Sequence, residues 1–393
     1  MNISSRNAFR PCTSCQLCSV ICPKQAITIK LDEEGFYRPY IDNNLCVDCG
    51  LCVMSCYKFD ENIKETNEED LENVNHYAAS TNHGLIAKAT TSGGIADILA
   101  THLSKAGYNV IGVKFDCNDN CAKHFVASSE QETKLFRGSK YIQSYAVSAL
   151  RVLVEKCRNN KFAIFGLPCQ IYSISKYLDT IDRRNDCILI DLYCHGCPSM
   201  LVWKKVSEKV RKKLKVQNFD EVIFRSKKKG WGKFVLEIRA QGKIYLSSPL
   251  HNEFYDLFFS NQVLNESCID CKLRSTLAYT DIRLGDYWGP IYKKNKLGVS
   301  AVTLVTDNGQ SLFNEISSEI NSSVKPITSF LPYQSWGHKY DCNEELRNTI
   351  FDVLKNKNTN IKDAVSIINK RQPVKKRIKV LIKQLLFLFN INY

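Results

Sequence analysis

The sequence lacks the long apolar run that a membrane-spanning helix requires, because no stretch reaches about eighteen uninterrupted apolar residues. Its start, Met1-Asn-Ile-Ser-Ser-Arg-Asn, also lacks the apolar core of a secretory signal peptide, so we expect a cytoplasmic protein. No G-x-G-x-x-G follows a predicted strand and there is no P-loop, which excludes the usual fingerprints of dinucleotide and nucleotide binding. Basic residues outside the C-terminal segment are scattered and lack an aromatic recognition pattern, and we therefore expect no nucleic-acid partner.

Cysteine, in contrast, is abundant, with 18 copies in 393 residues. In a reducing cytoplasm such cysteines are expected to be thiolates that hold a metal, because disulfides are rare there. The chain has 44% hydrophobic residues and is long enough for two or three domains with a sizeable core. The cysteine positions are therefore the first guide to function.

Two cysteine runs near the N-terminus share the spacing C-x2-C-x2-C-x3-C, one over residues 12–22 and one over 46–56. Such a run places three thiolates on one loop, where they bind one cluster, while its fourth cysteine, on the helix that follows, binds the other cluster. We therefore predict two [4Fe-4S] clusters that exchange their fourth ligands. The expected sets are Cys12, Cys15, Cys18 and Cys56 for one cluster, and Cys46, Cys49, Cys52 and Cys22 for the other.

A zinc site or a disulfide framework is the alternative, because cysteine pairs two residues apart also hold zinc. A four-thiolate zinc site needs two pairs, not a triplet plus a fourth cysteine. It also requires neither the repeat nor the Pro23 that follows the first run. The spacing therefore favours iron-sulfur clusters.

Behind the cysteine runs the pattern changes to strands and helices in alternation. Apolar runs at 109–115, 162–166 and 187–193 are typical of buried parallel strands, and segments at 95–105, 146–156, 170–178 and 201–214 have helical spacing. Later segments at 221–225, 234–240, 244–247 and 299–306 indicate strands of a second, mixed or antiparallel sheet. The expected fold class is α/β, or α+β overall. We expect a ferredoxin-like 2[4Fe-4S] module over 1–60, a linker over 61–80, an α/β iron-sulfur flavoprotein-like body over 81–343, and a helical basic tail over 344–393.

Two further cysteines lie where an α/β fold places its chemistry. Cys169 and Cys194 each follow a predicted parallel strand, at the sheet edge where ligands bind in open α/β folds. Cys268 and Cys271 add a close pair, and we propose a third [4Fe-4S] cluster on these four cysteines. Cys197 is an alternative to Cys194, and free cysteines that serve only packing are the competing interpretation.

Several motifs follow one another in order between about residues 80 and 340. They are Thr91-Ser-Gly-Gly94, Gly138-Ser-Lys-Tyr141-Ile-Gln-Ser144, Gly166-Leu-Pro-Cys169-Gln-Ile, Asp191-Leu-Tyr-Cys194-His-Gly, Ser267-Cys-Ile-Asp-Cys271 and Asp281-Ile-Arg-Leu-Gly-Asp286-Tyr-Trp-Gly289. In these motifs the chain resembles the coenzyme F420 hydrogenase/dehydrogenase beta-subunit family, some of whose members carry a ferredoxin-like front end. The resemblance implies an iron-sulfur flavoprotein, and it strengthens the assignment of the third cluster.

The resemblance also implies an FAD or FMN, and the candidate contacts are Ser92, Gly93, Gly94, Ser139, Lys140, Tyr141 and Asp286. The serine and glycines open a predicted helix, whose N-terminus offers free N–H groups to a phosphate, although a plain helix cap is the competing explanation. Lys140 is expected to neutralise a phosphate or the reduced flavin, and Tyr141 to stack on the ring. A solvated loop lysine, and a simple turn around Asp286, are the alternatives.

Electron counting then predicts the function. Clusters pass electrons singly and a flavin converts them to hydride, so we predict an oxidoreductase that links a ferredoxin-like partner or a catalytic subunit to a small organic acceptor, coenzyme F420 or another. A flavin-free electron-transfer adaptor is the alternative. Basic residues followed by the apolar segment 380–389 predict an amphipathic terminal helix, which either contacts a membrane surface or packs on its own domain.

Overall fold

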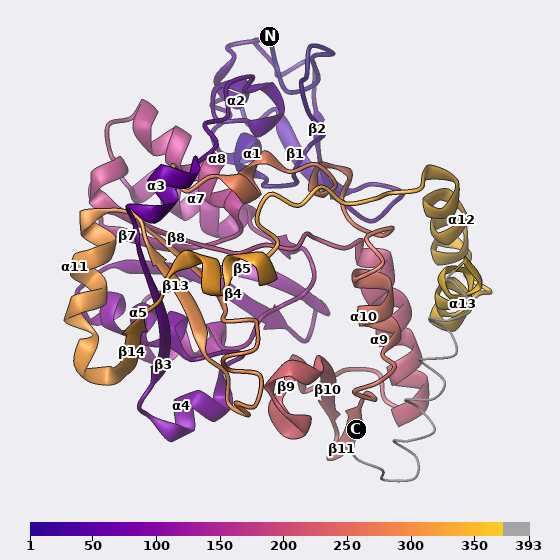
Figure 1. Cartoon of the computed structure of the whole chain (residues 1–393). Coiled ribbons are helices and arrows are strands. Elements are labelled where there is room, and N and C mark those ends of the chain that lie inside the picture. The colour runs from indigo at the N-terminus through magenta and orange to yellow at the C-terminus, as the bar shows by residue number, and fades with distance from the viewer. Residues whose placement is uncertain (372–393) are drawn as a thin grey trace.

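The computed structural model describes residues 1–371, so the predicted amphipathic helix around 380–389 lies outside the described residues. The chain forms a large central sheet with helices on its faces, an N-terminal segment at the top, and a second sheet below with its own helices (Figure 1). Within residues 1–371, no helix combines the length and apolarity of a bilayer span.

The central sheet has nine strands in the order β14-β3-β13-β12-β8-β7-β4-β5-β6. Their bounds are β3 (Asn75–Thr81), β4 (Asn109–Asp116), β5 (Cys121–Ala127), β6 (Ser144–Tyr145), β7 (Phe162–Phe165), β8 (Cys187–Leu192), β12 (Ile282–Asp286), β13 (Ser300–Leu304) and β14 (Ile320–Val324). Strands β4, β7, β8 and β12 are parallel neighbours, whereas β13, β3 and β14 pair antiparallel beyond β12. The α/β class and the parallel arrangement of the three predicted strands are confirmed.

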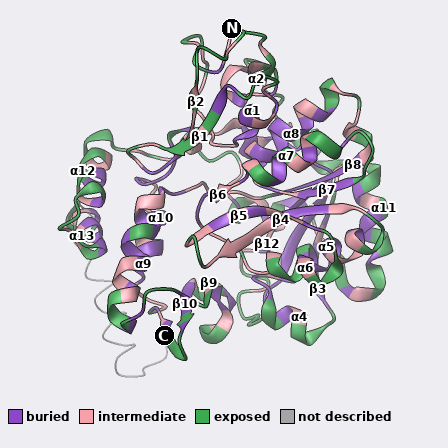
Figure 2. Ribbon diagram, turned by 180° about the vertical axis from the view of Figure 1, so that it is seen from behind, coloured by how far each residue is buried: buried purple, intermediate pink, exposed green. Residues whose placement is uncertain are grey.

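Helices cover both faces of the parallel strands. Alternate side chains of β7 and β8 point to opposite faces, so Ile188 and Ile190 pack with α5 (Ile95–Lys105) and α11 (Asp307–Glu315). Phe162 and Leu189 pack on the other face with α7 (Val147–Lys156), α8 (Pro168–Thr180) and the short α1 (Leu17–Val20). Figure 2 shows these strands buried between helices whose outer faces are exposed. This double burial is why their sequences are continuously apolar.

Two strands differ from the sequence-based expectations. Strand β3 was not predicted, and it lies inside the central sheet although all of its residues except Thr81 fall in the segment expected to be a linker, after α3 (Glu68–Glu72). The strand expected at 299–306 is present as β13, but its assignment to the second sheet is wrong, because it pairs with β12 and β3. All five residues of β13 are buried, which is the property of an interior strand.

The second sheet is antiparallel and consists of β9 (Glu221–Ser226), β10 (Val235–Ala240) and β11 (Lys243–Leu246). Its core contains Trp203 and Phe224 and is closed by α9 (Met200–Leu214), α10 (Glu253–Phe258), α12 (Glu344–Lys355) and α13 (Ile361–Arg371). The described part of the predicted tail is therefore helical and contributes apolar side chains to this core. The short helices α4 (Gly84–Ala89) and α6 (Glu130–Thr133) complete the described α-helices outside the N-terminal segment.

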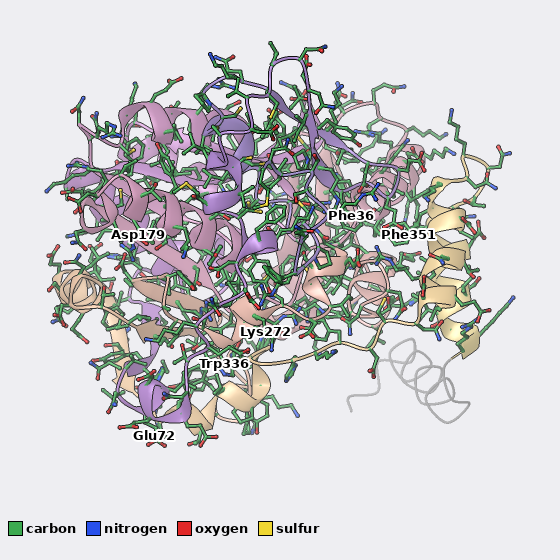
Figure 3. All side chains as sticks on the ribbon, turned by 90° about the horizontal axis from the view of Figure 1, so that it is seen from above. Phe36, Glu72, Asp179, Lys272, Trp336 and Phe351 are labelled. Atoms are coloured by element: carbon green, nitrogen blue, oxygen red, sulfur yellow. The ribbon has the colours of Figure 1, made fainter. Side chains whose placement is uncertain are left out.

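The N-terminal segment consists of α1, the hairpin of β1 (Ile27–Leu31) and β2 (Tyr37–Ile41), and α2 (Leu51–Met54). Its hairpin turn is anchored in the body: the carbonyl of Gly35 accepts hydrogen bonds from Met200 N at 3.0 Å and Gln143 Nε2 at 2.9 Å. A Cβ at Gly35 would lie 2.9 Å from Ser199 Oγ, and its φ of +76° also favours glycine. Figure 3 shows Phe36, the next residue, beside Phe351 of α12, and their ring centroids are 6.2 Å apart.

Candidate iron-sulfur sites and their surroundings

The first predicted ligand set surrounds an interior cavity in the N-terminal segment. Cys12, Cys15, Cys18 and Cys56 line it, together with Cys52 from the second run. Burial raises the pKa of Cys18, and repulsion from the thiols of the other three adds to the effect. Residues 1–371 contain no His, Cys, Asp or Glu group compact enough to hold a single metal ion. The four predicted ligands and Cys52 therefore line one cavity, and the cysteine spacing C-x2-C-x2-C-x3-C remains the argument for a cluster over zinc.

The second predicted set lies at the outer end of the same segment. Burial raises the pKa of Cys52, and the thiols of Cys22 and Cys49 contribute to the shift, which places these three together. Asn2 Nδ2 donates a hydrogen bond to Cys46 Sγ at 3.6 Å, an interaction typical of cluster thiolates. Cys49 is exposed. All 18 cysteines of the chain are free thiols, which removes the disulfide framework.

The third predicted set lines a second cavity, in the body. Cys169, Cys194, Cys268 and Cys271 all face it, as does Cys197. Burial raises the pKa of Cys169, and the thiols of the other three predicted ligands add to this shift. Cys197 is near Cys268 and Cys194, so both candidate residues lie at this cavity. The structure thus brings together four cysteines that are distributed over about a hundred residues of sequence, from Cys169 to Cys271.

The α/β fold explains this convergence. Cys169 is the second residue of α8, which follows β7 after the two residues Gly166 and Leu167, and Pro168 before it is suited to the first helical position. The neighbouring parallel strand β8 ends at Leu192, two residues before Cys194. Cys268 ends a short 3-10 helix (Glu266–Cys268), and Cys271 precedes another (Lys272–Ser275). The helix N-terminus also favours a thiolate at Cys169.

The first cavity and the body cavity are adjacent. Ser173, one turn after Cys169 on α8, is within hydrogen-bonding distance of Cys15 Sγ at 3.3 Å and of the Cys169 carbonyl at 3.1 Å. Thr13 and Ser14, between the first two ligand cysteines, line the body cavity as well. Arg38 also links the loop of Cys12 to the segment just before Cys268, because it donates hydrogen bonds to the Cys12 carbonyl at 2.8 Å and to Asn265 Oδ1 at 3.2 Å.

Three buried arginines lie around the predicted sites, and sequence reasoning missed all of them. Arg225, Arg274 and Arg283 are 3%, 4% and 2% exposed. Arg283 forms a two-point ion pair with Asp191 of the adjacent strand, with Nε–Oδ1 and Nη2–Oδ2 distances of 2.8 and 2.5 Å. Arg225 pairs with Asp286. Arg274 lines the body cavity, and only its position three residues after Cys271 could have drawn attention to it.

His195, which follows Cys194, is held by two side chains. Its Nε2 is 2.9 Å from Asn261 Oδ1 and its Nδ1 is 3.0 Å from the Tyr340 hydroxyl. Burial lowers its pKa to about 4, so the ring is neutral at physiological pH. The orientation of the His195 ring is therefore fixed by the side chains of Asn261 and Tyr340.

The predicted flavin residues form one hydrogen-bonded neighbourhood. Ser139 N donates to Thr91 Oγ1 at 2.7 Å, which joins the loop at 138–141 to the loop at 91–94. Lys227 Nζ donates to the Ser92 carbonyl at 2.9 Å, and the Arg225 Nη1 that pairs with Asp286 lies 3.2 Å from the Tyr141 hydroxyl. Arg225 and Lys227, which link the predicted residues, were not identified from the sequence.

Several of these residues also have structural roles. A Cβ at Gly93 would clash with the Ala79 carbonyl, and Gly94 has a φ of +86° at the N-cap of α5. Lys140 Nζ donates to the carbonyls of Phe136 and Arg137 at 3.0 and 2.9 Å, and burial lowers its pKa to about 7. Tyr141 packs edge-on against Tyr255. Their contact with a flavin stays a prediction.

Comparison with known proteins supports the two-part organisation. Residues 11–58 match the 4Fe-4S dicluster domain. Residues 159–329 match the family of the C-terminal part of the coenzyme F420 hydrogenase/dehydrogenase beta subunit. The loops at 91–94 and 138–141 lie outside both matched ranges.

One curated relative belongs to the F(420)H(2) dehydrogenase of Methanosarcina mazei, as one of its subunits, and is 25% identical over 191 residues. That alignment covers 47% of this chain and 53% of the relative, so the chain spans about half the length of the curated relative that it matches. A chain of the xenon-derivatised F420-reducing [NiFe] hydrogenase complex from Methanosarcina barkeri is 17% identical with a TM-score of 0.47, over 79% of this chain and 92% of that chain. The predicted resemblance is confirmed over these ranges: the chain combines a segment similar to the 4Fe-4S dicluster domain with a segment similar to the C-terminal part of the coenzyme F420 hydrogenase/dehydrogenase beta subunit.

Proposed function

We propose that this chain is an iron-sulfur oxidoreductase that relays single electrons between a ferredoxin-like partner and a flavin, which exchanges hydride with a small organic acceptor. Three [4Fe-4S] clusters, held by the three cysteine sets, would supply the one-electron steps, and FAD or FMN would supply the hydride step. The chain's own residues bind these groups, set their spacing and charge, and exclude water from the inner sites.

The adjacency of the three cysteine sets carries the proposal. Cys52 of the outer set lines the same cavity as the first set. Cys15 of that set contacts Ser173, on the helix that begins beside Cys169 of the body set. The sets therefore follow one another from the surface to the body without an intervening domain, as stepwise electron transfer requires.

The outer end of this series suits a protein partner. Cys49 is exposed, and the residues around it include exposed apolar side chains: Leu45, Val47, Leu51 and Met54 are 49%, 59%, 41% and 54% exposed. Apolar side chains gathered around a redox centre favour contact with another protein. A ferredoxin-like protein or a catalytic subunit is the proposed partner.

The inner end of the series is proposed to lie at the neighbourhood of Ser92, Tyr141 and Asp286. Lys227 supplies positive charge there, beside the ion pair of Arg225 with Asp286, and Trp288 stacks on Trp231 with ring centroids 5.0 Å apart and planes at 8°. Cations and flat aromatic surfaces are the groups that recognise a phosphate and a fused ring system. The name of the curated relative makes coenzyme F420 the first acceptor to test.

We also propose a cytoplasmic location, since 18 free cysteines require reducing surroundings to stay thiols. A contact of the terminal segment with a membrane surface belongs to the same proposal and falls on residues outside the described range.

Iron and flavin stoichiometry tests the proposal on one sample of the full chain, purified without oxygen and reconstituted. We expect about twelve iron atoms per chain and about one flavin released on denaturation. Iron near twelve without flavin after reconstitution would identify a flavin-free adaptor for a separate catalytic subunit. Iron near eight would remove the third cluster.

A further inference from the structure

Arg274 is a buried cation that pairs with no carboxylate in the described part of the chain. Of the three arginines around the sites, Arg283 pairs with Asp191 and Arg225 pairs with Asp286. Arg274 is 4% exposed and forms no ion pair with any carboxylate among residues 1–371. A charge buried without a counter-ion is strongly destabilising, so its compensation must come from elsewhere.

The contacts of Arg274 direct it to the body cavity. Its Nη2 donates to the His195 carbonyl at 3.1 Å and to the Cys268 carbonyl, and Nη1 donates to the His338 carbonyl. The guanidinium carbon lies 4.2 Å from the centroid of the Tyr340 ring. All of these partners are neutral. Two of them belong to the loops that carry Cys194 and Cys268, and the arginine lines the cavity that these cysteines enclose.

We infer that Arg274 is the fixed counter-charge of the cluster in the body cavity and that it raises the reduction potential of that cluster. This inference rests on the proposed function, in particular on the third cluster. Four thiolates and a cubane carry a net charge of about −2 when oxidised and about −3 when reduced. A permanent positive charge in a water-poor cavity therefore favours the reduced form. An electron that reaches the N-terminal clusters would then be drawn into the body.

A pair of substitutions separates charge from hydrogen bonding. Arg274→Lys keeps the charge and loses the planar guanidinium, whereas Arg274→Gln loses the charge and keeps a donor. Lys272→Met is the matched control, because Lys272 is next to Cys271 but is 43% exposed and paired with Glu65 at 2.9 Å. The third cluster is first established in the unaltered chain by iron content and by an electron paramagnetic resonance signal that Cys169→Ser removes.

The measurement is the midpoint potential of that signal during a redox titration, with iron content in parallel. We expect Arg274→Gln to lower the potential of the body cluster, with Arg274→Lys and Lys272→Met close to the unaltered chain and the N-terminal clusters unchanged. Retention of the cluster in Arg274→Lys but not in Arg274→Gln would also support the inference, because the charge would then be required to hold it. The inference is overturned if Arg274→Gln is loaded with an unshifted potential, or if both variants lose the cluster. Absence of the third signal from the unaltered chain would instead refute the proposed function.

Discussion

The buried pair of Asp191 and Arg283 provides a sharp test of how the body site is supported. It joins β8, which leads to Cys194, to β12, which follows Cys271 and ends at Asp286. Both side chains are almost fully buried, at 3% and 2% exposure, and two hydrogen bonds of 2.8 and 2.5 Å connect them. Removing one partner leaves the other charge buried and alone.

We expect Asp191→Leu or Arg283→Met to destabilise the body by about 3 to 5 kcal/mol. For a domain of this size, that corresponds to a fall in melting temperature of roughly 6 to 20 °C. Replacing both residues removes both charges together, and such apolar replacements are often near neutral. The double variant should therefore melt closer to the unaltered chain than either single variant does.

The unaltered chain, the two single variants and the double variant together form a double-mutant cycle. The melting temperature of each protein is measured at the same scan rate, and its iron content is measured in parallel. Iron bound in the body should fall in both single variants and recover in the double variant, because the strands that position Cys194 and Cys271 recover. The reasoning is refuted if the double variant loses as much melting temperature as the two single variants combined. In that case the pair would act as two independent residues.

Three further predictions address the sites directly. Cys169→Ser should remove about four iron atoms per chain, whereas Cys157→Ser, at a buried cysteine outside the three sets, should remove none when iron is measured after reconstitution. Val47→Glu and Leu51→Glu should slow electron exchange with a ferredoxin-like protein by about tenfold while reduction by dithionite is unchanged; an equal effect on both would contradict a docking role. Burial lowers the pKa of Lys227 from 10.5 to about 8, so the unfolded chain binds more protons between these values and stability should rise with pH there. Lys227→Met should flatten that rise in melting temperature between pH 8 and 10, and an unchanged slope would show that Lys227 is not responsible.

Much of this fold was predictable because the relevant signals are local. The strands at β4, β7 and β8 are buried on both faces, and their continuously apolar sequences report this directly. Strand β3 was missed because it contains His76, Ser80 and Thr81 among small residues, and its burial comes from neighbours distant in sequence. The placement of β13 depends on pairing with β3, and no local pattern encodes such a partner.

The residues of the candidate sites also fall into those that local sequence patterns predicted and those that they did not. Spacing within a loop predicts the ligand sets of the N-terminal cysteines, since one tight loop presents its thiolates together. Cys169 and Cys194 were proposed from their positions after parallel strands and Cys268 and Cys271 as a close pair, and the structure places all four around one cavity. Arg274, Arg225 and Ser173 had no comparable signal, because an arginine or a serine in a sequence does not reveal whether it will be buried or which group it will face.

The sequence by itself determined the iron-sulfur character of the N-terminal segment, the α/β class of the body and the resemblance of the body to the coenzyme F420 hydrogenase/dehydrogenase beta subunit. Cysteine spacing and apolar patterning are properties of residues close in sequence, so they can be recognised without knowledge of the fold. Only the tertiary structure decided that the cysteine sets adjoin one another, and that one buried arginine faces the body cavity without a carboxylate among residues 1–371. Distance and burial arise when remote segments pack together, and they are the quantities that govern electron transfer and the stability of a charge.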